Sequence, residues 1–153
     1  MARKPPEGRG HTLPQRDPDP SAKASGKPEA ISKNADPTTQ RALTRQNEAA
    51  DRLAQHGYDV EHSPEVPGSG NPDYKVNGKV CDCYSPSFGS ARNIAGEIQG
   101  KIDKEQTNRV VLNLADSPVD VSKMNAQLHD WPNPGLKEVI AIDKDGNILH
   151  LYP

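Results

Sequence analysis

Two aspartates nine residues apart flank a short turn in the stretch NPDYKVNGKVCDCYSP, residues 71–86. The turn residues Asn77-Gly78 are typical of a two-residue β-hairpin loop of type I′, which fixes the pairing of the strands. Counting outward from this turn places Asp73 opposite Asp82 on one side of the hairpin. The Cβ atoms of directly opposed residues lie about 5 Å apart. A register slip of one residue would abolish this pairing.

The expected pairing brings two like charges together, which destabilises a sheet. Either one carboxylate takes up a proton, or a cation binds between the two. Two carboxylates at this distance suit a hard divalent ion such as Mg²⁺ or Mn²⁺. The alternative is that Asp73 and Asp82 are solvated side chains near a turn, with Lys75 and Lys79 reducing the repulsion.

The two cysteines of the chain, Cys81 and Cys83, lie in the same hairpin arm. They are too few and too close for a disulfide framework or a closed zinc site. Since side chains alternate along a strand, both point to the face opposite Asp82. We expect them to be small buried apolar residues.

The surrounding chain predicts an α/β or α+β fold with a mixed sheet, because helical and strand patterns follow in the order αβββαβαββ. A helix capped by Thr38 or Thr39 and stopped by Gly57 comes first. The Asp145-Gly146 dipeptide predicts a second hairpin. The expected helices are residues 39–55, 93–105 and part of 116–130, and the expected strands are residues 58–62, 73–76, 79–84, 109–114, 139–143 and 147–151, with a loop at 63–72.

Composition divides the 153-residue chain in two. Residues 1–40 hold seven of the 15 prolines and almost no large apolar residue, which predicts a disordered tail or linker. Residues 41–153 read as one domain with a formal charge of −4, from 12 Lys and Arg against 16 Asp and Glu. An acidic domain needs a local basic groove or a metal to bind nucleic acid. No apolar run reaches membrane-spanning length, and we expect no signal peptide.

The motifs of residues 42–151 resemble, in order, those of the C-terminal tRNA nuclease domains of contact-dependent growth inhibition toxins of the CdiA type. Asn71-Pro72-Asp73-Tyr74, Asp82 and Tyr84-Ser85-Pro86 are the central match. The further matching segments are Asn47-Glu48-Ala49-Ala50, Leu53-Ala54, Gly57-Tyr58-Asp59-Val60, Arg109-Val-Val-Leu-Asn-Leu114, Asp116-Ser117-Pro118, Lys137-Glu138-Val139-Ile140 and Asp143-Lys144-Asp145-Gly146-Asn147-Ile148.

This resemblance implies a PD-(D/E)xK nuclease fold, with a mixed central sheet flanked by helices. It also implies a metal-dependent endoribonuclease that cleaves tRNA as an antibacterial toxin and has a cognate immunity protein. Such a toxin is secreted or delivered, and acts in the cytoplasm of the target cell. The expected metal is Mg²⁺ or Mn²⁺, with Zn²⁺ less favoured.

Carried over residue by residue, Pro72-Asp73 is the "PD" of the motif and Asp82 is the second acid. The usual lysine two residues after that acid is replaced by Tyr84. The resemblance implies that the lysine has moved to the following helix, where Lys101 is the first candidate and Lys104 the second. The alternative role of Lys101 is a helix ion pair with Glu97, four residues earlier.

The family also uses an acid on the first helix, and Glu48 is the matching residue. Helical geometry places Glu48 nearly opposite the apolar face of that helix, whereas Gln46 lies on that face. Glu48 is therefore either a site residue or a solvated surface acid, with Gln46 at the site position as an amide.

Two other functions remain open on the sequence alone. One is a catalytically inactive nucleic-acid- or protein-binding module of the same fold, and the other is a DNA nuclease. A 2′-OH attack without metal would need histidine, and His56, His62, His129 and His150 show no spacing typical of a pair. Trp131 is either a stacking platform for a base or, as we expect, a core anchor; Arg92 and Arg109 are candidate RNA-backbone contacts.

Overall fold

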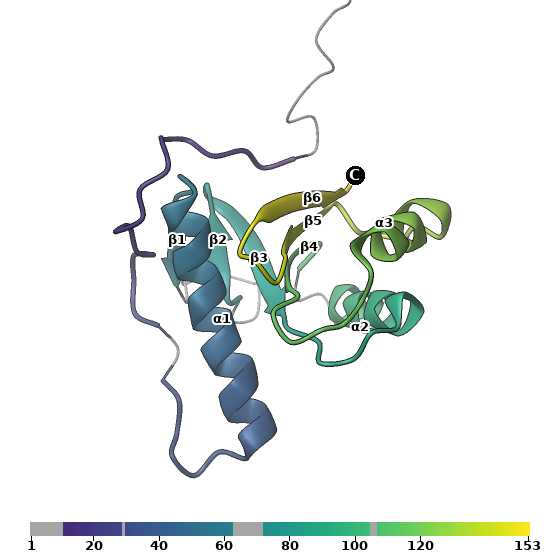
Figure 1. The fold of residues 1–153 in the computed structure, drawn as a ribbon, viewed down its shortest axis with the longest axis horizontal. Coiled ribbons are helices and arrows are strands. Elements are labelled where there is room, and N and C mark those ends of the chain that lie inside the picture. Colours follow the sequence, from purple (N-terminus) through teal and green to yellow (C-terminus); the bar gives the residue numbers. More distant parts are fainter. Residues whose placement is uncertain (1–10, 29, 63–71, 105–106) are drawn as a thin grey trace, which may run out of the picture.

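A six-stranded sheet with strands in chain order organises the computed structural model, which describes residues 11–28, 30–62, 72–104 and 107–153 (Figure 1). Helices and strands follow in the predicted order, and the α+β fold with a mixed sheet is confirmed. The predicted loop at 63–72 lies outside the described residues, apart from Pro72. The elements are α1 (Pro37–Gln55), β1 (Val60–His62), β2 (Tyr74–Val76), β3 (Lys79–Tyr84), α2 (Ala91–Asp103), β4 (Arg109–Asn113), α3 (Val121–Asp130), β5 (Glu138–Ile142) and β6 (Ile148–Tyr152).

The strand directions follow from the connections. Strands β1, β2 and β3 are antiparallel, as are β5 and β6. Strands β3, β4 and β5 are parallel, because α2 and α3 carry the chain back between them. The β2–β3 turn has left-handed backbone at both central residues, Asn77 at φ 50° and Gly78 at φ 80°. This is the conformation that a type I′ turn requires.

Side-chain oxygens cap the N-terminal ends of the three helices found in the described part of the chain. Asp36 accepts a hydrogen bond from the Thr39 N–H, so the cap of α1 lies two or three residues before the predicted cap at Thr38 or Thr39. Pro37 at the first helical position favours this earlier start. Ser90 and Asp120 cap α2 and α3 in the same way.

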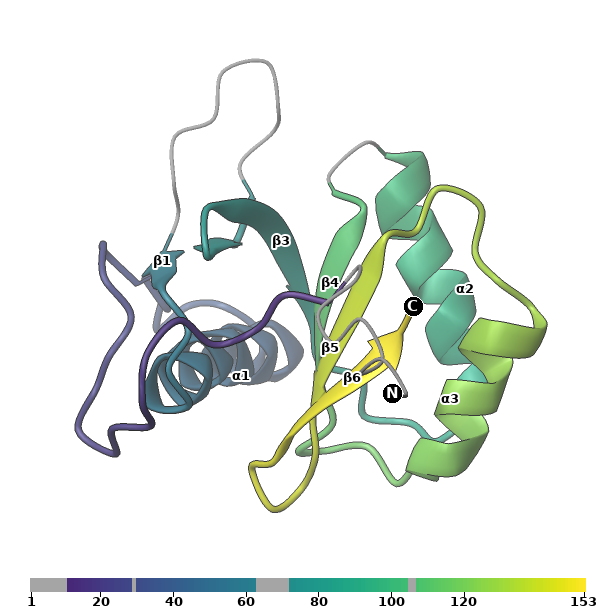
Figure 2. The ribbon, with the colours of Figure 1, turned by 90° about the horizontal axis from the view of Figure 1, so that it is seen from above.

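Two apolar cores lie on the two faces of the sheet (Figure 2). Helix α1 packs against one face through Ala49, Ala50 and Leu53. Helices α2 and α3 lie side by side on the other face. Residues of β4 alternate between the cores, since Val111 belongs to the α1 side and Val110 and Leu112 to the α2 side. No helix among the described residues is both long and apolar enough to cross a membrane.

Part of the N-terminal segment lies along the domain. The backbone N–H of Ser25 donates to the Val60 carbonyl, and the His62 N–H donates to the Ser25 carbonyl. Thr12 is buried and its hydroxyl donates to the Glu138 carboxylate at 2.7 Å. These hydrogen bonds attach the segment, and Ala24 also packs against the core under α1. The boundary at residue 40 stays a prediction, and residues 1–10 lie outside the described residues.

Candidate nuclease site

The β2–β3 hairpin has the register that its turn predicted. Val76 pairs with Lys79, Lys75 with Val80 and Tyr74 with Cys81. One step further, the Asp73 N–H donates to Asp82 Oδ1 at 3.2 Å, and the Cys83 N–H donates to Asp73 Oδ2 at 2.8 Å. Each carboxylate therefore accepts a backbone hydrogen bond from the opposite arm, and the predicted juxtaposition of Asp73 and Asp82 is confirmed.

Asp82 is the buried member of the pair, with 4% of its surface exposed. Its neighbours Cys81 and Cys83 belong to the core under α1, which confirms that they are small buried residues. Burial raises the pKa of the Cys81 thiol to about 12 and that of the Cys83 thiol to about 11. Both thiols are protonated at neutral pH, so neither is a ready nucleophile.

The electrostatics of Asp82 favour a cation beside it. Burial raises the pKa of its carboxyl above the ordinary value, against the opposing effects of the Lys101 charge and the Asp73 N–H. Burial penalises the charged form of a carboxyl and therefore favours a bound proton or cation.

Lys101 comes to the pair from α2. Its Nζ lies 5.9 Å from the centre of the Tyr84 ring, a cation–π arrangement, and its charge is the largest influence that lowers the pKa of Asp82. Lys101 and Glu97 do not form the alternative ion pair in the described structure. Lys104 is exposed at the end of α2. Of the two candidate lysines, Lys101 is the one whose charge acts on Asp82.

Tyr84 occupies the motif position where a lysine is usual. Burial, and then the negative charge of Glu97, raise the pKa of its hydroxyl to about 12. The phenol is therefore neutral at physiological pH. Its ring lies under the ammonium group of Lys101, so the lysine from α2 lies beside the position where the motif would have its own lysine.

The two aspartates fit a hard divalent metal ion better than a zinc ion. Asp73 and Asp82 offer two carboxylates, and Mg²⁺ commonly binds one or two carboxylates together with waters and substrate phosphates. Among the described residues, no group of three or more His, Cys, Asp and Glu side chains is arranged to hold an ion. A hard divalent ion fits this arrangement, whereas a closed zinc site would need four ligands.

The first helix does not bring Glu48 to this pair. Helix α1 packs on the face of the sheet that holds Cys81 and Cys83, opposite Asp82. The exposed Glu48 carboxylate forms an ion pair with Arg45 at 2.7 Å. Gln46 lies closer to the hairpin, since its backbone carbonyl accepts the hydrogen bond of the Tyr74 hydroxyl. These contacts favour a solvated surface acid at Glu48, and its role in the site stays a prediction.

An arginine cluster around Asp116 was not foreseen from the sequence. Arg45 contacts both Asp116 oxygens, at 3.0 and 2.9 Å, and Arg41 contacts Asp116 at 2.8 Å and the Ser85 carbonyl at 2.9 Å. Hydrogen bonds from these two arginines hold the pKa of Asp116 below its ordinary value. The available signal was Arg41 and Arg45 one helical turn apart, facing an acid directly after the β4 segment.

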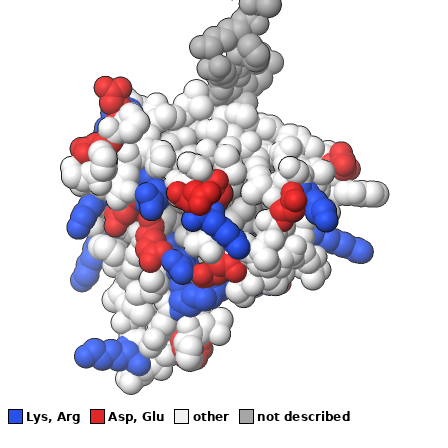
Figure 3. All heavy atoms as spheres, in the orientation of Figure 1, with Lys and Arg blue, Asp and Glu red and all other residues white. Residues whose placement is uncertain are grey.

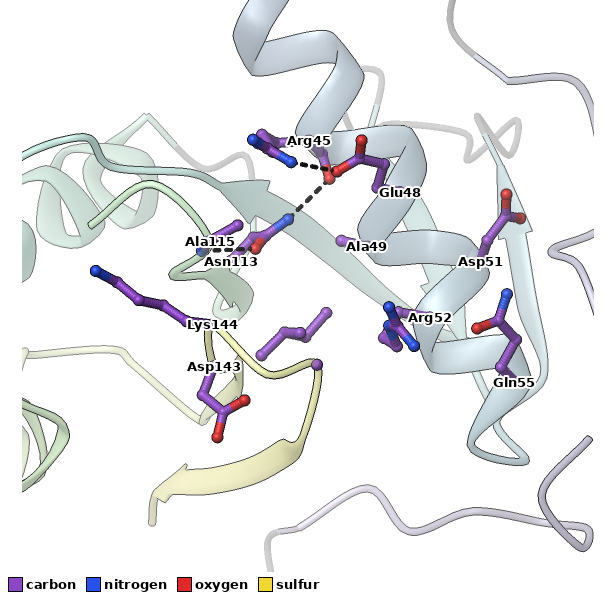
Figure 4. A pocket seen from close by; sticks show the side chains of 12 residues that line it. Arg45, Glu48, Ala49, Asp51, Arg52, Gln55, Asn113, Ala115, Asp143 and Lys144 are labelled. Carbon is purple, nitrogen blue, oxygen red and sulfur yellow. Dashed lines mark hydrogen bonds and ion pairs between the residues drawn. The ribbon is translucent and has the colours of Figure 1, made fainter. Parts of the chain in front are cut away.

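A polar cavity of about 360 Å³ lies beside this cluster, between α1 and the ends of β4 and β5 (Figure 4). The carboxylates at its wall already have partners. Glu48 forms an ion pair with Arg45, and Asp51 accepts a hydrogen bond from the Ala24 N–H. Asp143 accepts hydrogen bonds from the backbone N–H groups of Asp145 and Asn147 in the β5–β6 turn. This cavity is on the α1 side of the sheet, so it is separate from Asp73 and Asp82.

Three of the four candidate histidines have ring contacts that account for them. The His129 ring nitrogen is 2.8 Å from the Leu151 carbonyl, and His62 is buried edge-on against Tyr74. His150 stacks on His11 with ring centres 4.9 Å apart, a pair that the sequence did not indicate. Trp131 was expected in the core, and this prediction is wrong because 74% of its surface is exposed.

Comparison with known proteins agrees with this geometry. The sequence model described as the contact-dependent growth inhibition CdiA C-terminal domain matches residues 70–148, which include the hairpin and Lys101. The tRNA nuclease CdiA-2 of Burkholderia pseudomallei strain 1026b is 46% identical over 136 residues, or 89% of this chain. The chain spans only 4% of that relative's length.

A solved structure also matches. The chain resembles one described as the CdiA-CT/CdiI toxin and immunity complex from Burkholderia pseudomallei, with a TM-score of 0.82 and 46% identity. The match covers 86% of this chain and 99% of the other. The family model and the solved structure lead to the same assignment. The chain belongs to the family of contact-dependent growth inhibition CdiA C-terminal domains.

Proposed function

We propose that this domain is a metal-dependent endoribonuclease that cleaves tRNA. The observation that supports it most strongly is the buried Asp82, paired with Asp73 across the hairpin and approached by Lys101. The similar protein named a tRNA nuclease supports the substrate. The PD-(D/E)xK assignment of the fold is part of the proposal.

Asp73 and Asp82 hold the metal in this proposal. A bound Mg²⁺ or Mn²⁺ would supply a Lewis acid for the phosphoryl oxygen and lower the pKa of a bound water. The hydrogen bonds from Cys83 N–H and Asp73 N–H fix the direction of the two carboxylates. Lys101, positioned over Tyr84, stabilises the negative charge that develops on the phosphate in the transition state.

The domain acts as an antibacterial toxin and binds a cognate immunity protein. The similar solved structure is a complex of toxin and immunity protein, which supports this part of the proposal. A nuclease that cleaves tRNA must reach the cytoplasm of its target cell, so delivery from a secreted protein completes the proposal.

The test uses Asp82→Asn and Asp73→Asn with Asp145→Asn, an exposed acid in the β5–β6 turn, as the matched control. We expect both hairpin variants to lose tRNA cleavage by about a hundredfold to a thousandfold, because the metal contributes several kcal/mol. The control should cleave like the parent, and EDTA should stop the parent.

Gels of total RNA and plasmid DNA distinguish the competing functions. Cleavage of plasmid alone would identify a DNA nuclease. Folded Asp82→Asn protein that cleaves tRNA as fast as the parent would exclude the proposed site. A parent domain that cleaves neither nucleic acid with Mg²⁺ or Mn²⁺ present would identify a binding module.

A further inference from the structure

The chain contains one tryptophan and one phenylalanine, and both are at the surface. Trp131 is 74% exposed and Phe88 is 37% exposed, whereas aliphatic residues and Tyr58 and Tyr74 fill the cores. A large apolar side chain left at the surface forgoes the free energy of its burial. Large apolar residues that are exposed on one surface are candidates for contact with a ligand.

Arg92, on the first turn of α2, connects the two aromatic residues. It borders a hollow of about 540 Å³ shared with Phe88, Asn93, Gly96 and Glu97. It also borders a second hollow of about 420 Å³ shared with Gln127 and Trp131. No carboxylate of the described residues lies within ion-pair distance of Arg92. A guanidinium without a carboxylate partner therefore lies between two exposed rings.

Both aromatic residues are attached to a fixed backbone. The Trp131 N–H donates to the Gln127 carbonyl at 3.0 Å as the last bond of α3, and Pro132 follows. The Phe88 carbonyl accepts from the Ser117 hydroxyl at 2.6 Å. Rigid aromatic side chains lose little conformational entropy when a ligand binds.

This surface leads along α2 to the candidate site. Asn93, Glu97 and Lys101 are spaced four residues apart, so they share one face of the helix. Glu97 borders the hollow beside Phe88, and its charge also acts on the Tyr84 hydroxyl. Lys101, one turn further, lies over the Tyr84 ring and acts on Asp82. Helices α2 and α3 lie side by side in both views (Figures 1 and 2). Arg92 and Trp131 border one hollow, so Trp131 extends the surface that follows α2.

We propose that Trp131, Arg92 and Phe88 form a subsite for unpaired nucleotides of the RNA substrate, a proposal that rests on the proposed function. The rings stack on bases, and the guanidinium contacts the phosphate between them. Aromatic platforms combined with a cation are the usual chemistry for single-stranded nucleic acid. A protein partner also favours exposed Trp and Arg, but the continuity with Lys101 and Asp82 favours the substrate.

Binding is measured first without cleavage, in the Asp82→Asn background with EDTA. A short single-stranded oligoribonucleotide of mixed sequence is the probe, and quenching of the only tryptophan reports stacking on Trp131. With labelled probe, Trp131→Ala should weaken binding by roughly 5- to 150-fold, the range for one base–aromatic stack. Arg92→Gln should weaken binding and reduce its salt dependence.

Matched variants separate stacking from apolar docking. Trp131→Phe keeps a ring and should bind within a few-fold of the parent, whereas Trp131→Leu keeps apolar surface and should bind as weakly as Trp131→Ala. Leu13→Ala removes another exposed apolar side chain, and Lys144→Gln removes a cation beside the α1-side cavity. Neither control should change binding.

Two binding results would overturn the subsite, and a kinetic result would do so as well. One is unchanged probe affinity in Trp131→Ala and Arg92→Gln. The other is that both variants bind the probe like the parent but no longer bind the immunity protein, which would identify the surface as a protein interface. In the active parent, Trp131→Ala should raise KM for tRNA more than it lowers kcat. If the parent cleaves tRNA and KM does not change, the subsite fails while the proposed function stands.

Discussion

Asp116 and Asp82 are both aspartates beside the parallel strands, yet their surroundings are opposite. Asp116 is contacted by two arginines, and its pKa is lowered. Asp82 is buried beside a second carboxylate with Lys101 as the main opposing cation, and its pKa is raised. A fully compensated acid stabilises the fold, whereas an undercompensated acid costs stability and suits a bound cation. The contrast distinguishes Asp116, an acid that stabilises the fold, from Asp82, the acid that we propose to bind the metal.

After the losses expected for the two hairpin aspartates, the largest effect on cleavage is expected at Lys101, the cation that acts on Asp82. Lys101→Met should reduce tRNA cleavage by about tenfold to a hundredfold, because it removes charge stabilisation at the phosphate without removing a carboxylate. The measurement is the initial rate of tRNA cleavage at saturating substrate. Lys104→Met, at the end of the same helix, is the control and should keep the parent rate. Equal losses in both variants would remove the assigned difference between the two lysines.

The two aspartates should respond in opposite ways to removal of their charge. Asp116→Asn leaves Arg41 and Arg45 without their carboxylate, which is 21% exposed, and should lower the free energy of unfolding by about 1–2 kcal/mol. Asp82→Asn should be as stable as the parent or more stable in EDTA. Urea unfolding measures both. A variant Asp82→Asn that is less stable than Asp116→Asn would contradict the contrast.

The pH dependence of stability should show the same difference on a smaller scale. Since the folded pKa of Asp82 is raised, the folded state binds more protons than the unfolded state above the ordinary aspartate pKa. The stability from this group is present at low pH and falls as the pH rises from the ordinary aspartate pKa through the raised pKa of Asp82. Asp116 has a lowered pKa, so the stability that it contributes is present above the ordinary aspartate pKa and is lost as pH falls below it.

Thermal unfolding across pH, with and without Mg²⁺, checks both signs. In EDTA, Asp82→Asn should lose less stability than the parent as pH rises. Mg²⁺ should raise the parent's Tm at neutral pH by mass action and leave that of Asp82→Asn unchanged. An equal rise in both proteins would place the metal elsewhere.

The smallest effect is expected at Glu48. Its carboxylate is exposed and pairs with Arg45, so Glu48→Gln should change the cleavage rate by less than about twofold and stability by less than about 0.5 kcal/mol. A loss of cleavage as large as that of Asp82→Asn would return Glu48 to the site.

The sequence predicted what depends on local geometry. The two-residue turn at Asn77-Gly78 specifies the register by itself, so the facing of Asp73 and Asp82 was readable without any long-range contact. The order of helices and strands along the chain was also predictable from local sequence, because the apolar residues of each segment follow the period of a helix or of a strand. Lys101 required the resemblance as well, because α2 sets its distance to the sheet.

The features that were missed depend on contacts between distant segments. The exposure of Trp131 depends on where α3 ends relative to α2, which no local pattern states. The course of residues 11–28 depends on hydrogen bonds to β1 and β5, formed by residues without an apolar period. The Asp116 cluster joins α1 to the segment after β4, across more than 70 residues.

The strands lie in the sheet in the same order as in the chain, and this has a consequence for folding. Each new strand of the sheet docks at the edge left by the one before it, so no strand has to enter between two others. A chain that emerges with its N-terminus first can therefore add the strands in the order of synthesis, with α2 and α3 connecting the parallel strands. The segment around Thr12 is the exception. It comes first in the chain but needs Glu138 of β5, so we expect it to be among the last parts to dock.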